Sequence, residues 1–325
     1  MTARSSVAAA AHGSRALSAR AFEALLVVLA LASLVFFALR LLPGDPARLV
    51  LGDEATADEL GRLRAALHLD EPLLAQYMRF VRGLATLDLG ESLRRPGVPA
   101  MTLVLAALAP TARLAGAAVA IGAVAGVSIA ILASGPWLRP SLRTWLERAL
   151  VGLAAVPLLA FAPVATWGLA ARTHVVPLPG DPDAGAAGLL FASTLLAIPL
   201  AAHVGRISRA ALRQIERAPY LTVARAKGAG PFRVWLVHAL PVVAGPVVTV
   251  VAAQLGALLG GAVVLERMFE RWGLGALILQ AYSTRDLPVL EGSVIAAGLL
   301  FVAVQAIGTA VHIAIDPRAR ANASA

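Results

Sequence analysis

Residues 114–133 read LAGAAVAIGAVAGVSIAILA, a run of 20 residues that contains no Asp, Glu, Lys or Arg. An α-helix needs about 20 apolar residues to cross the roughly 30 Å of hydrocarbon in a bilayer. Backbone polar groups in lipid must find their partners inside the segment, which a helix allows and an isolated strand does not. The run therefore indicates a transmembrane helix.

Four further runs contain no charged residue: Ala149–Ala171, Ala184–Gly205, Ala239–Leu265 and Gly292–Ile315. A shorter run, Ala24–Leu39, lies between Glu23 and Arg40, whose side chains can reach the two interfaces by snorkelling. The span around residues 114–133 is expected to begin earlier, near Thr102. We predict an all-α membrane protein with six transmembrane helices.

The composition supports this class. Of the 325 residues 59% are hydrophobic and 14% are charged, whereas soluble domains average about a quarter charged residues. The apolar excess is interpreted as surface that faces lipid. The chain has no cysteine, which excludes disulfides, thiolate metal sites and cysteine nucleophiles.

The first apolar run, within residues 21–42, could also be a secretory signal peptide with Arg15 and Arg20 as its charged region. Its apolar core is longer than a typical signal core, and Leu41-Leu42-Pro43 lacks the small residues of a cleavage site. We interpret the run as a retained helix that follows an N-terminal tail, residues 1–20.

The distribution of charge predicts the orientation. Residues 1–23, 134–148, 206–238 and 316–325 hold 15 basic and 4 acidic residues, and the rest of the chain holds 13 basic and 15 acidic residues. Cytoplasmic loops of membrane proteins carry the excess of Lys and Arg. Both termini, including the tail 316–325, are therefore expected in the cytoplasm. The net charge of +9 then reflects topology, and no nucleic-acid partner is predicted.

The one long external segment, residues 43–100, carries helix signals. Thr56-x-x-Glu59 is a capping box, and a second helix is expected to start with Asp70 as N-cap and Pro72 in its first turn. The predicted apolar face of that helix consists of Leu73, Leu74, Tyr77, Phe80, Val81 and Leu84. This segment could be a docking surface, a lid, or a cap that only packs on the spans.

Small residues and prolines recur within the spans. Gly122-x-x-x-Gly126 and Gly256-x-x-x-Gly260 have the spacing that lets helix backbones approach closely, although general Ala/Gly richness explains them as well. Pro157 and Pro163 predict a kink in the third span.

The cytoplasmic loop 206–240, part of a predicted five-helix core over residues 101–315, has ordered punctuation. Pro219 suits the first turn of a short helix, Tyr220–Lys227, which Gly228 is expected to stop with a positive φ. A second amphipathic helix, Phe232–Leu240, is expected to lead to Pro241 and the fifth span. The pattern predicts a helix–turn–helix that projects from the membrane.

This loop resembles a known signature. Thr222-Val-Ala-Arg-Ala-Lys-Gly228, nine further residues and His238-Ala-Leu240-Pro241 resemble the coupling loop E-A-A-x-x-x-G-x9-I-x-L-P of binding-protein-dependent ABC permeases. Ala224, Gly228, Leu240 and Pro241 match. The Thr-x-Ala-Arg-Ala-Lys-Gly variant is similar to the oligopeptide/dipeptide/nickel branch.

Further matches to that branch run through nearly the whole chain: Leu42-Pro-Gly-Asp-Pro46, Leu69-Asp-x-Pro-Leu73, Gln76-Tyr77, Asp88-Leu-Gly-x-Ser92, Leu178-Pro179-x-Asp181, Gly260-Gly-Ala-Val-Val-x-Glu266, Phe269-x-x-x-Gly273-Leu-Gly275, Arg285-Asp286-x-Pro288 and Asp316-Pro-Arg318. One departure is Trp272, where the branch usually has proline. The loop between the third and fourth spans is also short.

The resemblance implies a type I ABC importer permease fold in the bacterial inner membrane. It implies partnership with a homologous second permease, two cytoplasmic ATPase subunits and an external substrate-binding protein, and import of peptides, nickel or a related small solute. By the same resemblance the ATPase contact would involve Pro219, Tyr220, Thr222, Ala224, Arg225, Lys227, Gly228, Leu240 and Pro241. The chain contains no G-x-x-x-x-G-K-[ST] phosphate loop, so ATP hydrolysis is expected elsewhere, with no cofactor in this chain.

Other classes find less support in the residues. A metalloenzyme or hydrolase would need a ligand cluster or a nucleophile–base pair, and the six histidines show no H-x-x-x-H spacing. A proton-coupled transporter would normally carry an acidic residue in mid-span, and the charge-free runs have none. A receptor or scaffold without transport activity remains an alternative. Thr194, Gln254 and Gln305 could line a pathway or only pack between helices.

Overall fold

The computed structural model describes residues 22–315 except 24, 42–44 and 53. In this part of the chain the regular elements are helices, and the only β-pairing is an isolated bridge between Glu91 and Pro99. The helical class is thus confirmed. The predicted tails 1–20 and 316–325 and the Leu42-Pro-Gly motif lie outside the described residues.

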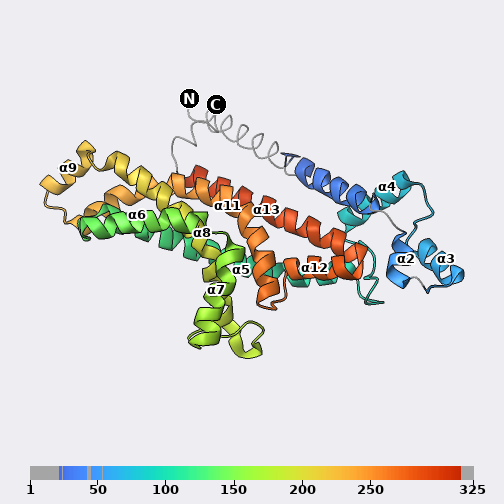
Figure 1. Cartoon of the computed structure of the whole chain (residues 1–325). Helices are drawn as coiled ribbons and strands as arrows, with labels where there is room; N and C mark the ends of the chain where they lie inside the picture. Colours follow the sequence, from blue (N-terminus) through green and yellow to red (C-terminus); the bar gives the residue numbers. More distant parts are fainter. Residues whose placement is uncertain (1–21, 24, 42–44, 53, 316–325) are drawn as a thin grey trace, which may run out of the picture. The chain divides into compact units, whose positions relative to one another are not determined.

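The elements in chain order are α2 (Pro46–Leu51), α3 (Ala57–Ala66), α4 (Leu73–Thr86), α5 (Ala100–Ser134), α6 (Pro140–Ala155), α7 (Leu158–Thr166), the π-helix η1 (Trp167–Arg172), the 3-10 helix η2 (Pro182–Ala184), α8 (Gly185–Ile215), α9 (Pro219–Ala226), α10 (Pro231–Arg233), the π-helix η3 (Val234–Ala239), α11 (Leu240–Met268), α12 (Leu274–Thr284) and α13 (Leu287–Ile315) (Figure 1). An apolar helix, Leu25–Arg40, precedes them.

Among the described residues, four helices are long and apolar enough to span a membrane: Ala100–Ser134, Gly185–Ile215, Pro231–Met268 and Leu287–Val311. The bent pair α6 and α7 makes a fifth if it is one span, and Leu25–Arg40 is shorter than a full span. The structure therefore gives four or five spans by length and composition. Six spans remain a prediction.

The chain forms two compact units. One consists of the chain up to Ala112 together with Arg271–Val302, and the other of Arg113–Glu270 together with the chain from Ala303 onward.

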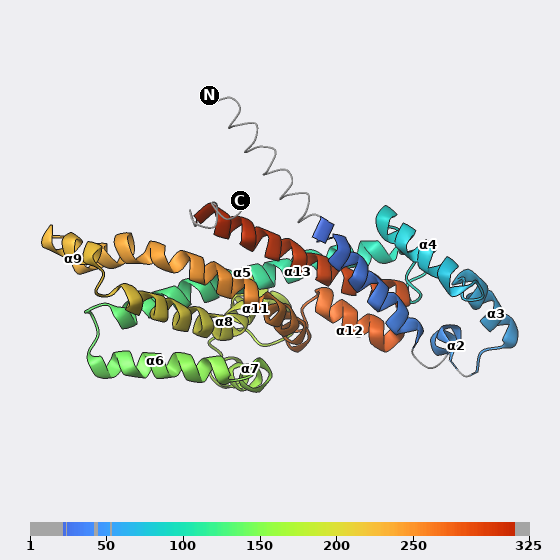
Figure 2. The same ribbon diagram turned by 90° about the horizontal axis from the view of Figure 1, so that it is seen from above.

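In the second unit α8 packs against α6 and α11 (Figure 2). The glycines of α5 explain its close approach to α8. A Cβ on Gly126 would lie 2.6 Å from the carbonyl oxygen of Ala201, and one on Gly122 would lie 2.8 Å from Leu200. Of the two interpretations left open for this pair, the close approach supports the packing role. A Cβ on Gly260 would meet nothing within 4 Å, whereas its neighbour Gly261 packs against Leu158 and Leu196, so the predicted contact is shifted by one residue.

The third predicted span is broken more sharply than the expected kink. Helices α6 and α7 meet at an angle of 107°, which is visible where α7 turns away from α6 (Figure 1). Val156, the residue before Pro157, has an extended backbone with φ −80° and ψ 122°. The ring of a following proline disfavours the helical conformation, so α6 ends there and Pro157 precedes the first turn of α7.

In the first unit, α5, α12 and α13 share a core made of Ala100, Val104, Ala107, Leu274, Leu277, Ala281, Val289 and Leu290. A second cluster joins Phe36 of the apolar N-terminal helix, Phe80 of α4 and Ile295 of α13. This cluster holds α4 against the first helix.

The segment 43–100, predicted to be external, contains three helices among its described residues rather than two. The capping box of Thr56 and Glu59 is confirmed. The N-cap prediction for Asp70 is wrong, because α4 starts at Leu73 after Pro72. An N-cap at Asp70 would require Glu71 to be helical directly before a proline, which is sterically disfavoured. The predicted apolar face is only partly buried: Phe80 is covered, whereas Leu73 and Leu74 are exposed.

Candidate functional site

The loop between α8 and α11 carries the short helix α9 (Figure 1). Pro219 occupies its first turn, where a missing N–H costs no hydrogen bond. Ala218 before it is extended, with φ −64° and ψ 138°, as a residue preceding proline prefers. Leu221 is completely buried. The start of α9 is thus fixed by proline geometry and by one apolar anchor.

The end of α9 is fixed by Gly228. Its φ is +82°, which confirms the predicted positive value. The N–H of Ala229 donates to the carbonyl of Ala224 at 3.1 Å, and the N–H of Gly228 donates to that of Arg225 at 3.0 Å. These two bonds form a Schellman motif, which requires a left-handed residue at the position of Gly228. Ala224 and Gly228, two residues of the quoted signature, are therefore the two ends of one helix stop.

The segment that returns from α9 to the bundle, residues 231–240, differs from the prediction. Instead of a separate helix Phe232–Leu240, the chain is helical without a break from Pro231 to Met268, through α10, η3 and α11. The π-helix η3 ends directly before Leu240-Pro241. A proline inside an α-helix loses one backbone bond and crowds the carbonyl four residues earlier, and we attribute the local π-turn to this strain.

The returning segment is anchored in the helix bundle of the second unit. Trp235 and Ala239 are buried in one cluster with Leu212 of α8 and Ile131 of α5. The return side of the α8–α11 loop is thus attached to the bundle by Trp235, and α9 in turn packs against η3.

The outward surface of α9 combines apolar and basic groups. Tyr220 and Val223 are 45% and 51% exposed. Pro219, Thr222, Arg225, Lys227, Gly228 and Pro241 are exposed, while Ala224 and Leu240 are half-buried. The structure brings all the predicted residues up to Gly228 onto one short element, and places Leu240 and Pro241 on the return helix.

An ionic network lies at the base of this loop. Arg209 of α8 donates to Glu147 of α6 at 2.9 Å, to Glu216 at 2.7 Å and to the hydroxyl of Ser134 of α5 at 3.0 Å. Arg213 binds the second oxygen of Glu147. No sequence motif predicted this network. The helical spacing of Arg209, Arg213 and Glu216 places them on one face, but Glu147 and Ser134 come from other helices.

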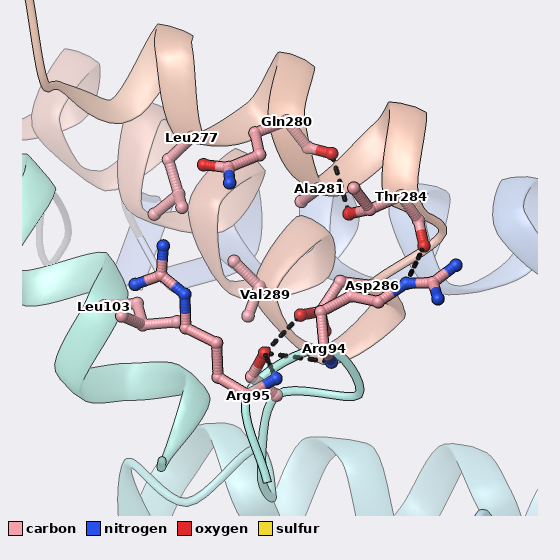
Figure 3. Close-up of a pocket in the computed structure, with 10 residues that line it drawn as sticks. Arg94, Arg95, Leu103, Leu277, Gln280, Ala281, Thr284, Asp286 and Val289 are labelled. Atoms are coloured by element: carbon pink, nitrogen blue, oxygen red, sulfur yellow. Dashed lines mark hydrogen bonds between the residues drawn. The ribbon is translucent and has the colours of Figure 1, made fainter. Parts of the chain in front are cut away.

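A second polar junction lies in the first unit. The hydroxyl of Ser92 donates to Asp286, whose other oxygen accepts the N–H of Leu93 at 3.1 Å. Arg94 donates to the carbonyl of Thr284 at 2.6 Å. Figure 3 shows the bonds to Asp286 from Ser92 and to Thr284 from Arg94 in a small pocket beside Arg95. Two motifs quoted separately above, Asp88-Leu-Gly-x-Ser92 and Arg285-Asp286-x-Pro288, thus meet in space.

A buried ion pair connects the N-terminal helix with α13. Arg40 donates to Glu291 at 2.7 Å, to Gln76 of α4 at 3.2 Å, and lies 3.5 Å above the ring of Phe36. Glu291 is 6% exposed.

In the described part of the chain no group of three or more His, Cys, Asp or Glu is arranged to hold a metal ion.

Comparison with known proteins agrees with the features of the loop. The sequence profile of the binding-protein-dependent transport system inner membrane component matches residues 118–321, and the N-terminal profile of the corresponding membrane component matches residues 14–101. The chain belongs to this family of transport permeases. The resemblance inferred from the motifs is confirmed.

Similar proteins of this family span nearly the same length. A putative peptide transport system permease of Brucella abortus (strain 2308) is 32% identical over 93% of this chain and 97% of its own. A dipeptide transport system permease of Alkalihalophilus pseudofirmus is 30% identical over 90% of this chain and 95% of its own. A glutathione transport system permease of Pectobacterium atrosepticum is 34% identical over 88% of this chain and 92% of its own.

Membership establishes several points. The permease is a multi-pass integral inner-membrane protein and a transport subunit, not a catalytic one, and the family carries no cofactor. A binding-protein-dependent system also implies a binding protein and ATPase partners.

The predicted pathway residues of the permease lie on three helices of the second unit. Thr194 on α8 is exposed and donates to its own helix, at the carbonyl of Leu190. Gln254 on α11 and Gln305 on α13 are half-buried. Helices α11 and α13 approach each other at Ala252 and Gly308, where a glycine Cβ would lie 3.8 Å from the alanine. A role in the pathway is a proposal for these three residues.

Proposed function

We propose that this permease forms one half of the translocation pathway of an ATP-driven importer for peptides or a related small solute. The other half is a homologous permease, and two cytoplasmic ATPase subunits and an external binding protein complete the transporter. Family membership over both the core and the N-terminal segment supports this assembly.

The proposed substrate class rests on the relatives. Those named above are described as permeases for peptides, dipeptides and glutathione, and all of these substrates contain peptide bonds. A short peptide or peptide-like solute is the common denominator.

The proposed orientation has six spans and both termini in the cytoplasm. The segments then placed inside hold 15 basic and 4 acidic residues, against 13 basic and 15 acidic outside. Exposed Trp137 and Trp145 flank the start of α6, where interfacial aromatic residues are enriched. In this orientation α9 faces the cytoplasm.

The coupling role of α9 is supported by one observation above all. Its two ends are fixed, by Pro219 at the start and the Schellman turn at Gly228, while Tyr220 and Val223 point outward with about half of their surface free. A short helix with a preset direction and an exposed apolar face suits insertion into a groove on an ATPase subunit.

The test uses the absence of native cysteine. Thr222→Cys places a single thiol on the exposed face of α9, and Thr86→Cys places one at the exposed end of α4. We expect a membrane-impermeant maleimide to label Thr222→Cys only in inside-out vesicles and Thr86→Cys only in right-side-out vesicles. With the ATPase subunits present, only Thr222→Cys should form a crosslink to them.

Each result separates the alternatives. A receptor or scaffold without transport activity would give no crosslink to an ATPase subunit and no ATP-dependent uptake in proteoliposomes. Labelling of both thiols from the same side would contradict the proposed topology. Replacement of Gln254 or Gln305 by alanine should reduce uptake without reducing the crosslink if these side chains line the pathway.

A further inference from the structure

A cavity of about 480 Å³ opens beside α9, within the second unit. Its walls include Ser134 of α5, Arg143 of α6, Arg209 of α8, Arg217 of the α8–α9 turn, Arg225 of α9 and Trp235 of η3. Small-molecule sites in proteins typically have volumes of about 300–1,000 Å³. The cavity is large enough for a ligand. Its lining residues come from α5, α6, α8, α9, α10 and η3 and from the turns between them.

The charges around this cavity are unbalanced. Four arginines line it against one carboxylate, Glu216, which is paired with Arg209. Within the described chain no carboxylate lies within 4.0 Å of the guanidinium groups of Arg143, Arg217 or Arg225. Three cationic groups, from α6, the α8–α9 turn and α9, therefore border one cavity without an acidic partner.

The wall behind these arginines is rigid. Arg209 is held by Glu147, Glu216 and Ser134, and only 14% of its side chain is exposed. Trp235 below it is 4% exposed. At the rim the Nε of Arg143 donates to the carbonyl of Leu138 at 3.0 Å, which leaves its terminal N–H groups for a ligand. A fixed wall beside such guanidinium groups reduces the side-chain ordering that binding would cost.

The chemistry of the rim selects the ligand. A guanidinium group presents a planar fork of N–H donors that matches two oxygens of a phosphate, and arginine clusters recognise phosphate groups in this way. A phosphate also carries enough negative charge to balance several arginines.

The position along the molecule favours a ligand at membrane-surface level. Trp137, next to the lining residue Pro136, is 40% exposed, and Trp145, two residues after Arg143, is 62% exposed. Tryptophans of this kind are enriched at the level of lipid headgroups.

We propose that this cavity binds a phosphate-bearing ligand through Arg143, Arg217 and Arg225. The phosphate group of an anionic lipid and a soluble phosphate share the chemistry that the arginines recognise, and the cavity is accessible to both. Because Arg225 belongs to α9 and Arg143 to α6, a bound phosphate bridges the coupling helix to the bundle.

The consequence for transport rests on the coupling role proposed for α9. A bridged α9 is held in the direction in which it meets the ATPase, so occupancy of the cavity raises ATPase engagement. Binding itself requires only the permease chain, so the two ideas can fail separately.

The binding experiment uses the full-length permease in nanodiscs. Phosphatidylglycerol is titrated into phosphatidylcholine nanodiscs, and inorganic phosphate is titrated separately into pure phosphatidylcholine nanodiscs. Hydrogen exchange of residues 219–226 reports whether α9 is braced. We expect one of the two probes to slow exchange in this helix, and the effect to weaken with added salt.

The variant Arg143→Gln/Arg217→Gln removes two rim charges and should weaken the apparent affinity of the effective probe roughly tenfold or more, the loss expected for charge-assisted hydrogen bonds. Arg148→Gln/Arg233→Gln is the matched control, since both residues are exposed and do not line the cavity. It removes the same charge and should change the affinity less than twofold.

The two titrations identify the source of the phosphate. Protection by phosphatidylglycerol alone indicates a lipid headgroup, and protection by inorganic phosphate indicates a soluble ligand. Equal loss in the two double variants would mean general charge attraction and would overturn the site. Unchanged protection in Arg143→Gln/Arg217→Gln, combined with lost ATPase co-purification, would also overturn it and assign the arginines to an acidic segment of the ATPase.

Discussion

The Ser92 hydroxyl donates a hydrogen bond to the carboxyl group of Asp286, although 194 residues separate the two in the sequence. Both are buried, at 3% and 4% exposure, and Asp286 also accepts the N–H of Leu93. The contact fixes the segment after α4 to the turn between α12 and α13 in the first unit.

Ser92→Ala should lower the free energy of unfolding by about 1–3 kcal/mol, because it leaves a buried carboxyl oxygen without its partner. A double-mutant cycle with Asp286→Ala should give a coupling energy of about 0.5–3 kcal/mol. Thermal unfolding in detergent measures both. Ser283→Ala, which removes only an exposed hydroxyl bonded to the carbonyl of Gln280, should have little effect. Additive effects of the two changes would contradict the contact.

Gly228→Val should strain the end of α9 by about 1–2 kcal/mol, because a β-branched residue is poorly tolerated at a φ of +82°. A Cβ there would meet nothing within 4 Å, so the backbone conformation alone carries the effect. Gly228→Asn should be milder, since asparagine tolerates left-handed geometry. We expect normal membrane abundance, weaker ATPase co-purification and lost uptake for the valine variant.

Two controls accompany that series. Gly230 is equally open but has φ −63°, so Gly230→Val should leave ATPase binding intact. Gly52 has φ +89° at the end of α2, so Gly52→Val introduces the same kind of strain away from α9 and should also spare ATPase binding. Full ATPase binding and uptake by Gly228→Val would show that α9 is not the coupling helix.

Gly126→Ala should destabilise the permease by about 1–3 kcal/mol, because its Cβ would press on the backbone oxygen of Ala201 and the backbone nitrogen of Gly205. Backbone atoms of a packed helix cannot move aside as a side chain can. Gly116→Ala, on the same helix α5, adds a Cβ to open space and should be neutral or slightly stabilising. Similar melting temperatures for the two variants would refute close packing between α5 and α8.

Leu221→Ala and Val223→Asp separate the anchoring of α9 from its contact surface. Leu221 is fully buried, so its truncation should cost about 2–5 kcal/mol of local stability and speed hydrogen exchange across residues 219–226. Val223 is half exposed, so Val223→Asp should leave exchange unchanged in the isolated permease and weaken ATPase co-purification. Faster exchange in Val223→Asp would mean that this side chain anchors the helix as well.

Glu71 gives a pH-dependent prediction for the segment between α3 and α4. Its hydrogen bonds to Arg79 hold the pKa of the carboxyl below the ordinary value of 4.5. A lowered pKa means that the stabilising contribution is complete above 4.5 and disappears as the pH falls through the folded value. Glu71→Gln should therefore lower the melting temperature at pH 7, and the difference from the wild type should vanish in strong acid. A difference that persists there would exclude the ion pair as its cause.

Local signals in the sequence were sufficient for several features. A charge-free run of helical length is itself a local signal for a span. Pro219 and Gly228 act on the backbone of the residues beside them, so the start and the end of α9 could be predicted without a structure. The capping box of Thr56 and Glu59 is equally local. The motifs also led to the family, which the profile matches confirm.

Local signals were less reliable where two of them competed. Asp70 is a good N-cap residue, but Pro72 prevented the helical turn that Asp70 would have capped. The Leu240-Pro241 pair suggested a helix boundary, whereas the chain continues through a π-turn, because Trp235 and Ala239 before the proline and Val243 after it are buried in the same cluster.

Only the tertiary structure decided which distant residues meet. Ser92 reaches Asp286, and Arg209 gathers Glu147 and Ser134, across separations of between 62 and 194 residues. No sequence period encodes such pairs, because their distance depends on how helices pack rather than on the rise of any single helix. The sequence by itself thus determined the class, the family and the form of α9. The packing of the helices determined the ionic network of Arg209, the cavity beside α9 and the partners of each buried charge.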